Sequence, residues 1–179
     1  SKILSTPSVQ IALQTVVSAD EGRKVAEEVE EAKEEVKIAI DLSGVHNGYE
    51  YVDMGLSVKW ATLNIGAQQP EGYGHYYAWG EIEPKDEYVW TTYKYCQGNP
   101  STLTKYNTSS SYGTVVDNKT QLELSDDAAR ANWGGSWRMP TDAEWTELRE
   151  QCTWTWTTQN GKSGYKVTSK SNGNNIFLP

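Results

Sequence analysis

The sequence predicts an α+β fold that is rich in loops, with short strands, two or three helices and a small β-α-β segment at its N-terminal end. Three observations favour this class. After residue 48, short alternating apolar and polar stretches are separated by glycine, asparagine and proline turns. A helix start is recognisable at Thr141. Aromatic residues are absent from residues 1–47 and frequent in residues 48–179, which predicts two differently organised parts.

Residues 133–145 give the strongest local signal, because they combine three tryptophans, a glycine pair and a helix start. Thr141 is a good N-cap residue, and Glu144 three residues later completes a capping box. Met139 precedes a proline and is therefore expected to be extended. These features predict a helix from about residue 142 to residue 151. The structural turn and cap are assigned to Arg138, Pro140, Thr141, Glu144 and Trp145.

The sequence pattern of residues 1–47 predicts a small β-α-β segment, separate from the rest of the chain. No role is assigned to it. Alternating stretches at residues 9–14 and 36–42 predict strands, and a helix is expected through residues 23–36. Valines form one apolar stripe on that helix, while its six glutamates most simply form a solvent-exposed face. The alternative is a coiled-coil or partner-binding helix, which two heptads support poorly.

Residues 48–179 predict short strands between turns and loops. The expected strands are at residues 56–61, 74–80, 153–157 and 164–168, with Asn160-Gly161 as a hairpin turn. A short helix is expected at residues 125–130, with Ser125 as its N-cap. Residues 97–120 are rich in glycine, asparagine, serine and threonine, and they predict a long surface loop.

Composition argues against several classes of protein. The net charge of −8 disfavours nucleic-acid binding, because phosphate contacts need clustered Lys and Arg. No apolar run approaches the roughly 18–20 residues of a membrane-spanning helix. With only two histidines and two distant cysteines, no metal or cofactor is expected. No oligomeric state is assigned.

Cys96 and Cys152 leave two alternatives open. A disulfide between them is as well supported as two buried thiols, since the separation of their Cα atoms decides between these states.

Catalysis is not expected. Glu81 and Glu83 share one face of an extended segment, as the carboxylates of a glycoside hydrolase would, but solvated pairs of this kind are common. His75 has no visibly coupled Ser or Cys nucleophile. Glu144 is already assigned to the helix cap, where Arg138 is expected to pair with it or with another carboxylate.

Exposed aromatic side chains are the favoured binding residues, because Tyr and Trp combine a large apolar ring with a polar group. The chain has eight Trp and eleven Tyr against a single Phe. Four aromatic residues in or near the polar loop are assigned to ligand binding: Trp90, Tyr93, Tyr95 and Tyr112. Five tryptophans are expected in the core: Trp60, Trp79, Trp133, Trp137 and Trp145. Binding is therefore expected away from residues 133–145.

Four segments resemble the Fibrobacter succinogenes major paralogous domain family, which occurs on exported proteins of Bacteroidetes-type bacteria. They are residues 49–61 (Tyr-Glu-Tyr-Val-Asp-Met-Gly-Leu-Ser-Val-Lys-Trp-Ala), 73–81 (Tyr-Gly-His-Tyr-Tyr-Ala-Trp-Gly-Glu), 126–141 and 164–179. Residues 138–145 are also similar to the Arg-Leu-Pro-Thr-x-Ala-Glu-Trp segment of formylglycine-generating enzymes. Residues 1–47 lie outside the resemblance.

The resemblance implies a C-type-lectin-like fold and an exported binding or adhesion module, at the cell surface or extracellular, with a lipid anchor as one means of attachment. The expected ligand is a glycan or a host or surface protein. The alternatives are an enzyme of the formylglycine-generating-enzyme-like group and a structural subunit of a surface appendage. Both families normally continue beyond the position of Pro179, so a C-terminally incomplete or shortened domain is expected. In the lectin-like fold, the residues that bind calcium and sugar usually lie in that later part. The catalytic cysteines of formylglycine-generating enzymes lie there too. Neither set has matching residues in this sequence.

Overall fold

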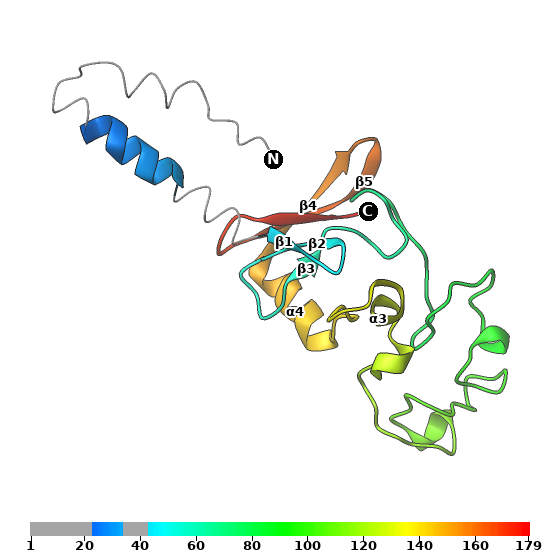
Figure 1. The fold of residues 1–179 in the computed structure, drawn as a ribbon. Coiled ribbons are helices and arrows are strands. Elements are labelled where there is room, and N and C mark those ends of the chain that lie inside the picture. Colours follow the sequence, from blue (N-terminus) through cyan, green and yellow to red (C-terminus); the bar gives the residue numbers. More distant parts are fainter. Residues whose placement is uncertain (1–22, 34–42) are drawn as a thin grey trace. The chain divides into compact units, whose positions relative to one another are not determined.

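The structure is a computed structural model and describes residues 23–33 and 43–179. The chain divides into two compact units, Ser1–Asp41 and Leu42–Pro179 (Figure 1). Residues 23–33 are helical, as the sequence predicts, and every side chain of this helix is exposed. Val25 and Val29, expected to face a local core, are 43% and 45% exposed. The two strands predicted beside this helix lie outside the described residues.

The first sheet of the second unit is antiparallel, with the strand order β1-β2-β3. It consists of β1 (Ser43–His46), β2 (Tyr49–Val52) and β3 (Trp60–Ala61). Asn47 and Gly48 connect β1 to β2 with positive φ angles of 50° and 85°, which is the hairpin chemistry of an Asn-Gly turn. Because β1 pairs with β2, the boundary between the units lies before residue 42 and not after the expected residue 47.

The second sheet is also antiparallel, with the order β4-β5-β6. It is built from β4 (Cys152–Gln159), β5 (Lys162–Ser169) and β6 (Asn175–Leu178). The predicted hairpin at Asn160-Gly161 is confirmed, since φ is 46° and 79° at these residues and Gln159 pairs with Lys162. Both strands of this hairpin are longer than the alternating patterns predict.

Two α-helices lie between the sheets in the sequence. The predicted helix after residue 141 is confirmed as α4 (Asp142–Gln151), and both hydrogen bonds of the Thr141–Glu144 capping box are present. The helix α3 (Ala128–Trp133) begins later than predicted. Its N-cap is Asp127 and not Ser125, because Ser125 lies in the 3₁₀ turn η3 (Leu124–Asp126).

Two predicted strands differ in the structure. Only Trp60–Ala61 of residues 56–61 pairs as a strand, and residues 74–80 are irregular. Gly74 explains the second difference, because its φ of 67° is a left-handed conformation and a Cβ atom there would lie 2.3 Å from the Ile65 carbonyl oxygen. A glycine turn packed this closely redirects the chain before it can pair along a sheet.

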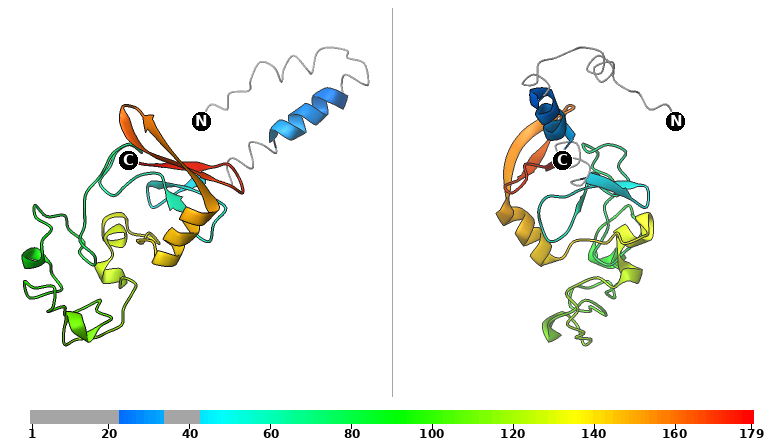
Figure 2. Two further views of the ribbon diagram at one scale, coloured as in Figure 1. Left: turned by 180° about the vertical axis from the view of Figure 1, so that it is seen from behind. Right: turned by 60° about the vertical axis from the view of Figure 1, so that its left-hand side comes forward.

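The core of the second unit joins α4 to both sheets. Its buried residues are Met54, Trp60, Leu148, Cys152, Val167 and Ile176. Trp145 at the start of α4 packs edge-on against Trp60, with ring centroids 5.1 Å apart. Figures 1 and 2 show α4 beside β4, while the loop-rich residues 81–127, coloured green to yellow, extend away from the sheets. The core therefore holds the sheets, and the loop-rich part needs its own interactions.

The helix cap can be tested by Thr141→Ala, which removes the acceptor of the Glu144 amide. We expect the free energy of unfolding to fall by about 1 kcal/mol, the usual cost of losing such a cap. Denaturant unfolding followed by circular dichroism measures this change. Thr120→Ala, at an exposed loop position, is the control and should change the free energy by less than about 0.5 kcal/mol. Equal losses in the two variants would contradict the capping role.

The ion pair at the same cap makes stability depend on pH. Hydrogen bonding from Arg138 is the main cause that lowers the pKa of Glu144 from 4.5 to about 2. A folded-state pKa below the unfolded value stabilises the fold above pH 4.5, and this contribution is lost as the pH falls towards 2.

Glu144→Gln keeps an oxygen acceptor for the Thr141 amide but removes the charge that Arg138 binds. We expect the wild type to have the larger free energy of unfolding at about pH 6, and the difference between the two proteins to shrink by about pH 3. Denaturant unfolding at both pH values measures it. A difference that stays constant with pH would rule out the ion pair as its source.

Candidate functional site

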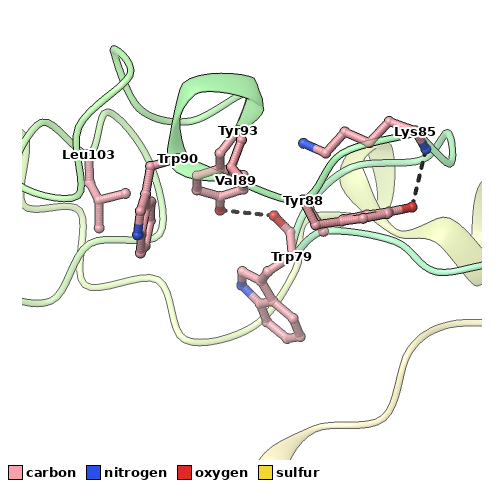
Figure 3. Close-up of a pocket in the computed structure, with 8 residues that line it drawn as sticks. Trp79, Lys85, Tyr88, Val89, Trp90, Tyr93 and Leu103 are labelled. Atoms are coloured by element: carbon pink, nitrogen blue, oxygen red, sulfur yellow. Dashed lines mark hydrogen bonds between the residues drawn. The ribbon is translucent and has the colours of Figure 1, made fainter.

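An open cleft of about 620 Å³ lies in the loop-rich part of the second unit (Figure 3). We call it the aromatic cleft, and it is lined by Ala78, Trp79, Lys85, Tyr88, Val89, Trp90, Tyr93 and Leu103. Two of the four predicted binding residues, Trp90 and Tyr93, belong to it. The cleft therefore brings together aromatic side chains that are separated by up to fourteen positions in the sequence.

The cleft is formed by a 3₁₀ turn, η1 (Trp90–Thr92). Hydrogen bonds tie this turn to the residues on either side of it: the Thr92 hydroxyl donates to the Glu87 carbonyl oxygen at 2.7 Å, and the Cys96 thiol donates to the Trp90 carbonyl oxygen at 2.9 Å. The Tyr93 hydroxyl donates to the Trp79 carbonyl oxygen at 2.9 Å, which joins the turn to the opposite wall (Figure 3). Side chains thus replace regular secondary structure in fixing the backbone here.

Three large rings of the cleft are exposed to an unusual degree. Trp79 is 43%, Tyr88 44% and Trp90 50% exposed. Trp79 therefore departs from its predicted place in the core, whereas Trp60 and Trp133 are buried as predicted. Trp137 and Trp145 are partly buried. Exposed aromatic rings that line one cleft are typical of a binding site.

The charges of the cleft are paired internally. Lys85 Nζ lies 2.8 Å from Glu81 Oε1, and it also donates to the Thr92 carbonyl oxygen at 2.8 Å. The same Glu81 oxygen accepts the Lys94 amide at 2.8 Å. Glu81 is therefore engaged in holding the cleft together, a structural role for one member of the carboxylate pair considered above.

Tyr93 stays a hydrogen-bond donor over a wide pH range. Burial is the main cause that raises the pKa of the Tyr93 hydroxyl to about 12, and the negative charge of Glu81 contributes. The phenol is therefore protonated at neutral pH and keeps its bond to the Trp79 carbonyl oxygen. Its ring packs edge-on to Trp90, with centroids 6.0 Å apart.

The other two predicted binding residues lie outside the aromatic cleft. Tyr95 is only 9% exposed and packs edge-on to Tyr106 at 5.4 Å, so it supports the cleft from behind. Its low exposure leaves no ring face for a ligand, which corrects the expectation for this residue. Tyr112 is 54% exposed in the 3₁₀ turn η2 (Ser110–Tyr112), and it does not line the cleft.

Asp126, in the segment predicted to begin a short helix, is the anionic centre of the loop-rich part. It is 5% exposed and binds Lys105 Nζ at 2.5 Å and the Tyr106 hydroxyl at 2.7 Å. Burial raises the pKa of Asp126, but hydrogen bonds from Lys105, Tyr95 and Tyr106 outweigh burial and lower this pKa well below its usual range. The carboxylate is therefore ionised at neutral pH.

The predicted surface loop at residues 97–120 is ordered around a buried asparagine. Asn107 is 1% exposed, and its Nδ2 donates to the Val115 carbonyl oxygen at 2.8 Å. Asp117 accepts the amides of Tyr106 and Asn107, each at 2.9 Å. Asn and Asp commonly bond nearby backbone groups, so these residue types were the available signal.

Both cysteines are free thiols, so of the two open alternatives the structure has no Cys96–Cys152 disulfide. Cys152 is buried in the core, where burial raises the pKa of its thiol. Cys96 is half-buried beside the aromatic cleft. Within residues 23–33 and 43–179, no group of three His, Cys, Asp or Glu side chains is arranged to hold a metal ion.

The supporting role of Asp126 predicts a local effect of Asp126→Asn. We expect this change to destabilise the loop-rich part by about 1–3 kcal/mol, because Lys105 and Tyr106 lose a charged, buried acceptor. Hydrogen exchange should accelerate in residues 93–107 while residues 152–178 stay protected. Asp86→Asn, at an exposed position, is the matched control and should leave both regions unchanged. Uniform acceleration in both regions would contradict a local role.

The wider comparisons add no assignment to this geometry. Comparisons with family models, curated proteins and solved structures found no match to this chain. In the described part of the chain, none of the helices combines the length and apolar character that crossing a membrane requires. A functional assignment therefore depends on the aromatic cleft and on the residues that support it.

Proposed function

We propose that residues 42–179 form a carbohydrate-binding module of an exported bacterial protein, located at the cell surface or outside the cell. The observation that carries this proposal is the aromatic cleft, in which Trp79, Tyr88 and Trp90 expose large ring surfaces beside a polar loop. The resemblance to the Fibrobacter succinogenes major paralogous domain family supports the exported location and, with the α+β architecture, a C-type-lectin-like fold. Binding or adhesion is then the role of the module.

Sugars are suited to this cleft because they combine apolar C–H faces with many hydroxyl groups. The C–H faces stack on exposed Trp and Tyr rings, and Trp79, Tyr88 and Trp90 offer such surfaces at 43%, 44% and 50% exposure. Lys85 is already paired with Glu81, so the cleft presents no uncompensated charge of its own. A neutral glycan therefore fits the cleft better than a strongly anionic one.

The proposal assigns binding without catalysis to the aromatic cleft. Glycoside hydrolysis needs two carboxyl groups free to act on the scissile bond. No carboxylate is among the lining residues of the cleft, and Glu81 beside it is occupied by Lys85 and by the Lys94 amide. These contacts favour a site that holds its ligand unchanged.

A glycan array tests the proposal, with titration calorimetry on each glycan that binds. We expect Trp90→Ala to weaken binding about tenfold or more, because removal of a central aromatic contact typically costs at least about 1–2 kcal/mol. Trp156→Ala is the matched control, since Trp156 on β4 is 63% exposed and does not line the cleft. This control should bind as the wild type does.

Three results would contradict the proposal. A broad array without any bound glycan would favour a structural subunit instead. Equal losses in the Trp90 and Trp156 variants would place the site elsewhere. Turnover of a glycan or peptide substrate by the wild-type protein would contradict the assignment of binding without catalysis.

A further inference from the structure

A second cavity, of about 690 Å³, lies in the same unit and shares no residue with the aromatic cleft. We call it the tryptophan cavity, because Trp60, Trp133, Trp137 and Trp145 line it together with Tyr73 and Tyr76. Three of these residues belong to the 133–145 segment, from which binding was expected to be absent. Strand β6 contributes Ile176 and Leu178 to the wall.

The walls of the tryptophan cavity are rigid and largely apolar. Trp60 and Trp145 form one edge-on pair, and Trp133 and Trp137 form another, each with centroids 5.1 Å apart. The β1–β2 hairpin holds the second pair in place, since Trp137 Nε1 donates to the His46 carbonyl oxygen at 2.8 Å. Aromatic pairs fixed in this way favour a flat apolar ligand, because little ordering of side chains is needed on binding.

The residues that line the tryptophan cavity offer no free carboxylate. Its carboxylate, Glu144, is occupied by Arg138 and by the Thr141 amide. Trp60 is 8% exposed, and its indole Nε1 has no hydrogen-bond partner among the described residues. The buried Tyr77 hydroxyl, from another lining residue, has none there either. Both atoms are closed to solvent, so they belong to the wall and are not offered to a ligand.

Lys59 adds an uncompensated positive charge to this lining. Its Nζ lies 4.9 Å from the centre of the Tyr51 ring, and no carboxylate of the described residues lies within 4.0 Å of it. The lysine is exposed, so its ammonium group can approach a ligand at the cavity mouth. Among the described residues, the cavity thus combines apolar walls with the unpaired ammonium group of Lys59.

We propose that the tryptophan cavity binds an apolar organic anion, with an aromatic or aliphatic body against the tryptophan rings and a carboxylate or sulfonate group near Lys59. This ligand class matches the apolar walls, the absence of a free carboxylate in the lining and the free ammonium group of Lys59. A neutral apolar molecule would gain no electrostatic contact with Lys59. The proposal is independent of carbohydrate binding in the aromatic cleft, which involves other residues and an internally neutral lining.

Two fluorescent probes that differ mainly in charge test this proposal on the full chain. 8-Anilinonaphthalene-1-sulfonate carries a sulfonate, and N-phenyl-1-naphthylamine has the same aromatic body without it. We expect the anionic probe to bind with one-to-one stoichiometry, about three- to tenfold more tightly than the neutral probe. Energy transfer from tryptophan should accompany binding, because four tryptophans line the cavity.

Substitutions of Lys59 then locate the charge effect. Lys59→Gln should lower the affinity for the anionic probe about three- to tenfold and leave the affinity for the neutral probe unchanged. Lys59→Arg, which keeps the positive charge, should bind both probes as the wild type does. Lys166→Gln is the matched control, because Lys166 is exposed on β5 and does not line the cavity. Near-ultraviolet circular dichroism confirms that each variant is folded before it is titrated.

Several outcomes would overturn the proposal. Equal affinities for the two probes would remove the role of charge. Equal effects of the Lys59 and Lys166 substitutions would show that only the net charge of the protein matters. If Trp90→Ala abolished binding of the anionic probe, the probe would bind in the aromatic cleft and not in the tryptophan cavity. Absence of saturable binding by the folded wild type would exclude the site.

Discussion

Two neighbouring carboxylates, Asp126 and Asp127, join the two halves of the larger unit. Asp126 binds Lys105 and the Tyr106 hydroxyl, and it thereby holds the loop-rich part that carries the aromatic cleft. Asp127 caps α3 through the Arg130 amide and also accepts the Met139 amide at 2.8 Å. Because both are almost fully buried, each must be completely paired, and two adjacent residues thus fix the relative positions of the loops and of the segment leading into α4.

Signals confined to a few consecutive residues were predictable from the sequence. The Thr141–Glu144 capping box and the Asn160-Gly161 hairpin each depend on local backbone chemistry, and both are present in the structure. Residues 74–80 alternate like a strand but have no neighbouring strand, since Gly74 turns the chain against Ile65. Asp127 rather than Ser125 caps α3 because only Asp127 also meets the distant Met139 amide. Pairing between distant segments therefore overrode local preference.

The same distinction applies to the binding surfaces. Trp90 and Tyr93 could be selected from aromatic content beside a polar loop, and both line the aromatic cleft. Tyr95 has the same local pattern but lies under Asp126 and Tyr106, which only the folded chain brings to it. The tryptophan cavity was not predicted, because residues 133–145 acquire an open face only when β3 and β6 pack nearby. Residue type thus predicted which side chains could contact a ligand, whereas burial in the folded chain determined which of them are exposed enough to do so.

The short β1 strand has a consequence for where this chain can be shortened. His46 accepts the Ser136 amide at 2.7 Å, and the Asn47 side chain donates to the Trp133 carbonyl oxygen. Removing the residues before Leu42 leaves these contacts intact, whereas beginning the chain at Tyr49 removes both of them and the strand beside β2. The compact unit that begins at Leu42 thus includes a strand that precedes the aromatic-rich sequence, and its boundary does not coincide with the change in composition at residue 48.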